Sequence, residues 1–496
     1  MKKRLLIAGL GAAVASLVLP GVASAATVAE TLAEKTSELD MVWVAVACVL
    51  VFLMQAGFMF LEIGFSRQKN VGTGVAKIFI NLAIVTIAWW AIGYGIAEGG
   101  GNKIFGDSGF FFHFDQTVGS GEEAFQVAGP DAMLMLYGLA FAAVSLAIVW
   151  GTTLERIKFG AYVIYAIVFG ALIYPLIAHA VWGGGLLSDI GGKPVMDFAG
   201  SSVVHLTGAV GALAALLLLG PRIGKYDAAG NPRAIPGHSM PLVGLGVIVL
   251  WIGWFGFNGG STFETSASFF GEVMLNTQLA AAAGVIGASL AVYMKSRTLD
   301  VGMAGNGAIA GLVGITAPSG FVEYWAAPII GFVAGLIVVY GVLAIDKFLD
   351  DPVGALSAHG LAGIWGTIAV GLFASPRLIV EGAAPGVWYS LFDDASFSAT
   401  FGQLGVQGLA VLFTFLVVFA ISIATFAAIK STIGLRVPPE EEDAGLDISS
   451  HGMYGYPEQF IPQPEYSTGL PGPVSHGSPR PTATPAPAQM TATETH

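Results

Sequence analysis

Eleven stretches of this sequence are apolar and long enough to cross a lipid bilayer, and this constrains the fold more than any other feature. A helix needs about 20 mostly apolar residues to span a hydrocarbon core of about 30 Å. The eighth stretch is short and glycine-rich. Because backbone groups in lipid must be hydrogen-bonded within their own segment, we expect an all-α polytopic membrane protein with eleven transmembrane helices. The stretches lie at residues 41–64, 76–98, 132–152, 160–182, 198–220, 239–258, 268–294, 303–318, 325–346, 354–374 and 404–429.

Composition supports this class and excludes others. Only 11% of the 496 residues are charged, whereas soluble domains carry about 25%. The net charge of −12 is not that of a nucleic-acid-binding protein, so we expect the lipid bilayer and no nucleic acid as a partner. The one cysteine, Cys48, excludes an internal disulfide and a cluster of cysteine metal ligands. We expect no cofactor and no metal.

The two ends of the chain differ from its apolar middle. Residues 1–25 combine a basic start, a short apolar run and an Ala-Ser-Ala cleavage site at 23–25, which predicts a secretory signal peptide. An additional membrane helix is the alternative, but the apolar run is short for one. The transmembrane domain then covers residues 41–430, followed by an acidic tail at 431–456. Residues 457–496 are rich in proline and predict disorder.

Lysine and arginine set the expected orientation. With the N-terminus outside, the predicted outer segments hold only Lys35, Lys103, Lys193 and Arg377, and the predicted inner segments hold many more. Cytoplasmic loops are enriched in these residues. We therefore expect the N-terminus outside and the C-terminus inside, as an odd number of spans requires.

One motif occurs twice, in the fifth and the tenth predicted helix. Asp-x2-Gly-x4-His begins at Asp197 and again at Asp351. The fifth helix runs inward and the tenth outward, so the two copies point in opposite directions. This predicts an inverted repeat, residues 41–220 and 239–374, with an eleventh helix at 404–429. Transporters built in this way often hold their substrate between the repeats, near the midplane.

The motif places a histidine deep in each of the two helices. His205 and His359 each lie eight residues beyond the aspartate, or about 12 Å along a helix, so the two imidazoles end at similar depths. A single buried histidine is more often bonded to a neighbouring helix. Two at matched positions favour the lining of a pathway, where they bond a small polar solute or relay a proton. Zinc or haem would need further ligands that are not nearby.

The aspartates have a structural interpretation. Asp is a favoured N-cap, and Asp351 precedes Pro352, a favoured first helical residue. We expect Asp351 to cap its helix. Asp197 lies near the outer mouth, where a carboxylate also helps to attract a cation, but we rank direct binding below the structural role.

Five longer motifs stand out along the chain: GFMFLEIGFSRQKN, DFAGSSVVHLTGAVGAL, WIGWFGFNGGS, NGAIAGLVGITAPSG and DPVGALSAHG. Together they resemble the ammonium transporter family (Amt/Mep/Rh), and in particular its prokaryotic Amt-type members. The likeness covers residues 41–456. It implies eleven helices with a five-plus-five inverted repeat and a homotrimer with one pore per subunit, located in the cell membrane. It also implies that the chain takes up ammonium for its nitrogen and is not an enzyme.

The resemblance carries roles onto individual residues. The twin pore histidines fall on His205 and His359. Ammonium recruitment outside falls on Phe141, Trp182 and Ser261, and the second gating aromatic, which closes the pore together with Phe141, falls on Phe257. The aspartate beneath the recruitment site falls on Asp197. The chain departs from relatives in extra residues between Trp182 and Asp197, and in Tyr137 where some have Phe.

The implied mechanism is that ammonium binds outside, loses its proton at the gate and crosses an apolar pore as ammonia. Aromatic faces attract a small cation, and a serine hydroxyl accepts an N–H. Methylammonium is an expected second substrate. The alternatives are an electroneutral Rh-like channel for ammonia or carbon dioxide, and an ammonium sensor. Residues 434–452 resemble the family's cytoplasmic tail, which implies coupling between subunits and a PII-type signalling protein as a partner; a plain solvated tail is the alternative.

Overall fold

The computed structural model describes residues 35–112, 116–118, 125–127 and 129–457. The predicted signal peptide and the proline-rich stretch 458–496 lie outside these residues. Among the described residues, ten helices are long and apolar enough to cross a membrane. The eighth predicted span is α10 (Val301–Thr316), a shorter apolar helix. The chain is thus an all-helical polytopic membrane protein.

The first half of the bundle begins with a long helix, Lys35–Phe65. It continues through η1 (Gln68–Asn70), α2 (Val71–Ala88), η2 (Trp89–Gly93) and α3 (Tyr94–Glu98), which together form one span. Next come α4 (Pro130–Thr152), then α5 (Phe159–Val168), η4 (Phe169–Ile173) and α6 (Tyr174–Val181), then η5 (Ser201–Leu206) and α7 (Thr207–Leu219). The elements η2, η4 and η5 are π-helical turns inside longer helices.

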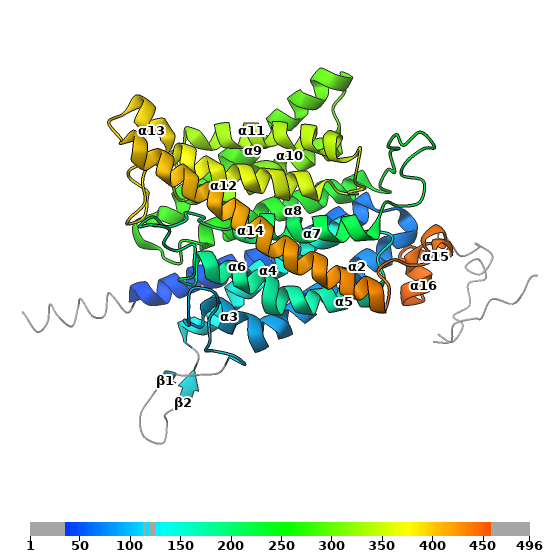
Figure 1. The fold of residues 1–496 in the computed structure, drawn as a ribbon, viewed down its shortest axis with the longest axis horizontal. Coiled ribbons are helices and arrows are strands. Elements are labelled where there is room, and N and C mark those ends of the chain that lie inside the picture. Colours follow the sequence, from blue (N-terminus) through cyan, green and yellow to red (C-terminus); the bar gives the residue numbers. More distant parts are fainter. Residues whose placement is uncertain (1–34, 113–115, 119–124, 128, 458–496) are drawn as a thin grey trace, which may run out of the picture.

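The second half contains α8 (Met240–Gly260), η6 (Ser266–Ser268), α9 (Phe269–Ser296), α10, α11 (Ala326–Ile345), the π-helical turn η7 (Leu356–Leu361) and α12 (Ala362–Phe373). The short helix α13 (Val387–Phe392) precedes α14 (Phe397–Thr432). At 36 residues, α14 is about 54 Å long, which exceeds a bilayer core. It crosses the bundle diagonally in Figure 1 and packs on α7 and α12.

A hairpin and the start of the second span differ from the sequence-based expectation. The strands β1 (Gln116–Val118) and β2 (Phe125–Val127) form an antiparallel hairpin between α3 and α4, in a loop where no strand was predicted. The second span starts at Gln68, eight residues before the predicted position 76, since η1 and α2 continue the helix through the polar GTG segment.

Buried ion pairs join four segments at one end of the bundle. Arg222 forms a two-pronged pair with Asp350, with N–O distances of 2.8 and 2.9 Å. Arg156 donates to the Asp350 carbonyl, and Arg67 pairs with Glu155 at 2.6 Å. Burial alone would raise the pKa of the Asp350 carboxyl, but the Arg222 hydrogen bonds and the nearby charge of Arg156 hold it at about 2. The carboxylate is therefore charged at neutral pH and holds these segments together.

The tail is docked against the bundle through α15 (Pro439–Ala444) and α16 (Leu446–His451). Asp447 accepts hydrogen bonds from the backbone N–H groups of Gly72 and Thr73, at 3.0 and 2.9 Å. Leu446 is fully buried. In Figure 1 these two helices lie at the right end of the bundle, opposite the start of the helix Lys35–Phe65.

Candidate functional site

The first Asp-Gly-His copy forms a tight turn ahead of a π-helical segment. The Asp197 carboxylate accepts hydrogen bonds from four successive backbone N–H groups, from Gly200 to Val203, at 2.8–3.1 Å. Gly200 has φ +113°, and a Cβ there would lie 2.6 Å from Val204. The turn therefore requires glycine at this position. It fixes the start of η5, which carries His205.

The second copy repeats this arrangement. Asp351 accepts from the N–H groups of Val353, Gly354 and Leu356 at 2.8–3.3 Å, and Gly354 has φ +76°. Burial raises the pKa of both the Asp197 and the Asp351 carboxyl, although the backbone N–H groups oppose this shift. Both carboxylates are hydrogen-bonded to backbone N–H groups of their own turns, as the side chain of a helix N-cap is.

The two motifs bring their histidines into direct contact. His205 and His359 lie with their Nδ1 atoms 3.3 Å apart, and their ring centroids are separated by 5.3 Å. For this to be a hydrogen bond, one Nδ1 carries a hydrogen and the other accepts it. His205 is fully buried and His359 is 5% exposed. Among the described residues the Nε2 atom of His205 has no hydrogen-bond partner, so it is free to bond a solute.

A line of aromatic rings leads from one side of the bundle to this pair. Trp182 meets Phe141 edge-on, with centroids 6.3 Å apart. Phe141 stacks on Phe257 at 3.9 Å and an interplanar angle of 12°. Phe257 in turn faces His205 at 5.5 Å. Phe141 and Phe257 are almost completely buried. The stacked phenylalanines therefore separate the histidines from Trp182.

A cavity of about 600 Å³ lies beyond the stacked rings, and we call it the outer cavity because the sequence predicts that this side faces outward. Phe141, Trp182 and Ser261 all line it, so the three predicted recruitment residues share one space. Trp182 is 36% exposed, and its indole N–H donates to the Asp197 carbonyl at 2.8 Å. Ser261 donates to the Phe257 carbonyl at 2.8 Å, which leaves lone pairs on its hydroxyl oxygen to accept an N–H.

Tyr137 and Glu98 also line this cavity, and neither was given a site role from the sequence. The Tyr137 hydroxyl lies 2.9 Å from the Gly256 and Phe257 carbonyls and 3.3 Å from the Ser261 Oγ. Sequence comparison marked Tyr137 only as a departure from relatives. Glu98, at the end of α3, also lines the cavity, and its position in sequence, an acid at the end of an apolar span, was the available signal.

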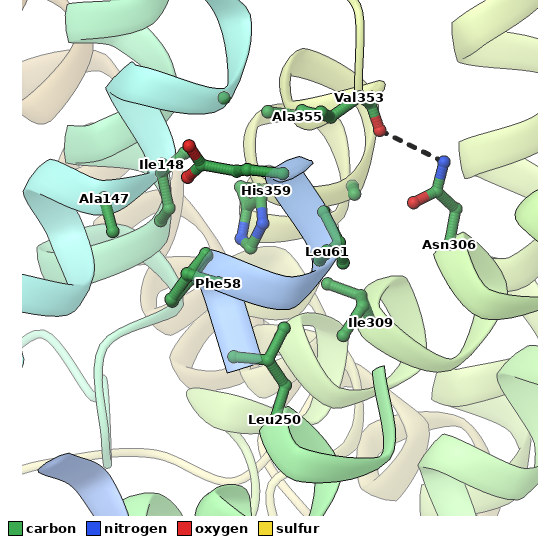
Figure 2. Close-up of a pocket in the computed structure, with 13 residues that line it drawn as sticks. Phe58, Leu61, Ala147, Ile148, Leu250, Asn306, Ile309, Val353, Ala355 and His359 are labelled. Carbon is green, nitrogen blue, oxygen red and sulfur yellow. Dashed lines mark hydrogen bonds between the residues drawn. The ribbon is translucent and has the colours of Figure 1, made fainter. Parts of the chain in front are cut away.

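A second, much smaller cavity lies on the other side of the histidine pair. Its volume open to the centre of a water molecule is about 20 Å³. Figure 2 shows His359 at this cavity together with Phe58 and Leu250, and with Asn306, which donates to the Val353 carbonyl. Glu62 also lines it. The sequence contains this acid within a predicted span, but no role was predicted for it.

Comparisons with known proteins identify the family of the chain. Residues 42–456 match the family model described as Ammonium Transporter Family. The chain is 42% identical to ammonium transporter Amt2 of Archaeoglobus fulgidus, over 86% of this chain and 91% of that protein. It is 34% identical to an ammonium transporter of Bacillus subtilis, over 85% and 99% of the two chains.

Solved structures show the same fold. A sensor Amt protein superposes with a TM-score of 0.75 at 31% identity, covering 84% of this chain and 99% of that one. Mep2 of Candida albicans gives a TM-score of 0.72 at 28% identity, covering 86% and 92%. The chain therefore belongs to the ammonium transporter family, as a multi-pass protein of the cell membrane that carries ammonium and is not an enzyme.

Proposed function

We propose that ammonium binds in the outer cavity, loses its proton at the stacked phenylalanines and crosses as ammonia past His205 and His359. One observation carries this proposal: the ring line from Trp182 through Phe141 and Phe257 ends on the contacting histidines. Aromatic faces and the Ser261 oxygen suit a small cation with N–H donors. Beyond the gate the surroundings are apolar, which favours the neutral species over an ion.

In this proposal the histidines have two tasks. Their free ring nitrogen atoms bond ammonia as it passes, and their mutual Nδ1 contact relays the released proton separately. Transport then moves charge, because a proton accompanies each ammonia. Asp197 acts by holding the η5 turn and the Trp182 ring through its backbone carbonyl, and Asp351 caps the matching turn.

The wider arrangement that we propose is the family's. The N-terminus lies outside and the C-terminus inside, and two five-helix repeats of opposite orientation precede the last helix. The start of the first helix and the tail at opposite ends of the bundle support an odd number of spans. Residues 1–25 serve as a signal peptide, and residues 431–456 serve as a regulatory segment. We also propose a homotrimer and a PII-type protein that meets the tail.

Two alternatives differ in what they transport or signal. An electroneutral channel would move ammonia without charge, but Trp182 and Ser261 form a site suited to a cation. A sensor is the second alternative, and one similar solved protein is called a sensor Amt protein. A sensor would pass its signal to a partner without needing net transport.

The test is electrical recording on purified protein in proteoliposomes, with ammonium, methylammonium and potassium compared across pH. We expect ammonium to drive a current that potassium does not. Replacing both histidines, His205→Leu with His359→Leu, is expected to abolish that current. An unchanged ammonium current in the double variant would show that the histidines relay no proton.

A further inference from the structure

Glu62 is a buried acid without hydrogen bonds. It lies near the end of the helix Lys35–Phe65 and is 1% exposed. Among the described residues neither of its carboxylate oxygens has a hydrogen-bond partner. Burying a carboxyl group in this way is costly, and such residues inside membrane proteins usually have a function. The proposed path for ammonium does not use it.

Lys77 of α2 offsets the charge of Glu62. Its side chain is fully buried, its amine also lacks a hydrogen-bond partner among the described residues, and its charge interacts with that of Glu62. An opposite charge nearby is what allows a carboxylate to remain ionised in an apolar setting. Because no hydrogen bond ties up the carboxylate oxygens, an ionised Glu62 is free to accept a proton.

The second, smaller cavity is shared by the Glu62 carboxyl group and the histidine pair. Both Glu62 and His359 line it, together with Asn306, and the remaining lining residues are apolar. A space of about 10–15 Å³ by this measure holds one water molecule, and this cavity has about 20 Å³. A water in this space has both the His359 imidazole and the Glu62 carboxyl group among its neighbours, and a water bonded to both would carry a proton between them.

We propose that Glu62 receives the proton from the His205–His359 pair on the inner side of the pore, with Lys77 offsetting the charge of the carboxylate once the proton has left. This rests on the proposed function. Ammonium loses one proton to the imidazole pair, and the ammonia crosses. The imidazolium passes the proton through the cavity water to Glu62, which releases it toward the end of the bundle that carries Arg67. The imidazoles return to neutral, so one ammonia and one proton cross for each ammonium.

The charged and titratable groups around Glu62 and Lys77 come from several elements. Lys77 comes from α2, Tyr162 from α5 and His359 from η7, and the charges of Glu155 and Arg156 reach Lys77 from the segment after α4. The Tyr162 hydroxyl donates to the Lys77 carbonyl. Of the two carboxylates named here, Glu62 and Glu155, it is Glu62 that lines a cavity together with a pore histidine.

The experiment measures how much charge crosses with each nitrogen. An inward gradient of ¹⁵N-labelled ammonium is applied to proteoliposomes. Current and ¹⁵N uptake are then recorded in parallel for the wild type and Glu62→Gln. We expect the charge moved per nitrogen to fall at least tenfold in the variant while ammonia continues to enter at high pH. Glu62→Asp is expected to recover part of the ratio. Asp227→Asn, which alters a half-buried acid of a loop away from the pore, should leave the ratio unchanged.

A second variant separates the loss of a proton acceptor from a folding defect. Glu62→Gln leaves the Lys77 charge buried without its partner, so Glu62→Gln with Lys77→Met is measured as well, and is expected to show the same low ratio. If current and nitrogen uptake fall together at a constant ratio, Glu62 is structural and the inference is wrong. If the wild type itself carries nitrogen without charge, the proton relay of the proposed function fails too, and the two failures are told apart by the wild-type trace.

Discussion

At the scale of single residues, Trp182 shows how the outer site is held. Its indole N–H is bonded to the Asp197 carbonyl, and its ring edge meets Phe141. The ring therefore keeps one orientation while more than a third of it stays exposed to the outer cavity. A pre-oriented aromatic face binds a cation without first losing rotational freedom.

Replacing this ring tests the cation site directly. Trp182→Leu removes the cation–π attraction, which is worth about 0.5–2 kcal/mol, so the ammonium concentration for half-maximal current should rise about 2- to 30-fold. The maximal current should change less, because the histidines remain. The matched control is Trp388→Leu, a tryptophan of α13 that does not line the cavity. Equal shifts in both variants would show that Trp182 has no special part in recruitment.

Which residues could be predicted from the sequence depended on repetition and resemblance. His205 and His359 were found because the same spacing occurs twice, and Phe141, Trp182, Ser261 and Phe257 because the family resemblance carried roles onto them. Glu62 stands in the motif GFMFLEIGFSRQKN, but the resemblance carried no role onto it. Its significance lies in a missing hydrogen bond and in a cavity shared with a residue nearly 300 positions away, and both are properties of packing.

At the scale of elements, the two π-helical turns η5 and η7 carry the histidines. Each follows an aspartate that binds successive backbone N–H groups and a glycine with positive φ. The helix that carries His205 therefore begins at Ser201, three residues later than the position 198 that hydropathy predicted. Hydropathy locates a span, but it does not show where a side chain replaces the first helical hydrogen bonds.

The glycine of the first turn is a second test. Gly200→Ala places a Cβ 2.6 Å from Val204 and 3.2 Å from the Trp182 ring, at a backbone angle that favours glycine. Strain and crowding together are expected to destabilise the protein by about 2–5 kcal/mol, seen as earlier thermal unfolding in detergent. The control is Gly244→Ala in α8, where a Cβ meets no atom within 4 Å and alanine should be neutral or slightly stabilising. Equal stability of the two variants would contradict the strain argument.

At the scale of the whole molecule, the tail completes a helix formed almost 400 residues earlier. Asp447 accepts from the N–H groups of Gly72 and Thr73, which are first-turn donors of α2 and have no partner within the helix. Asn70 accepts from the Leu446 N–H at 2.9 Å in return. The resemblance indicated a tail at 431–456, but this exchange between distant segments has no pattern in the sequence.

The same contact leads to a prediction about the tail. Asp447→Ala removes a cap worth about 0.5–2 kcal/mol, so the undocked fraction of the tail should rise about 2- to 30-fold. Trypsin cleavage after Arg436 is expected to accelerate by the same factor, since in the docked tail Arg436 donates to the Leu219 carbonyl of the bundle at 3.2 Å. Asp443→Ala, which removes an exposed acid of the same segment, is the matched control. If the tail regulates transport, ammonium current should change in the first variant and not in the second, whereas faster cleavage with an unaltered current would separate docking from regulation.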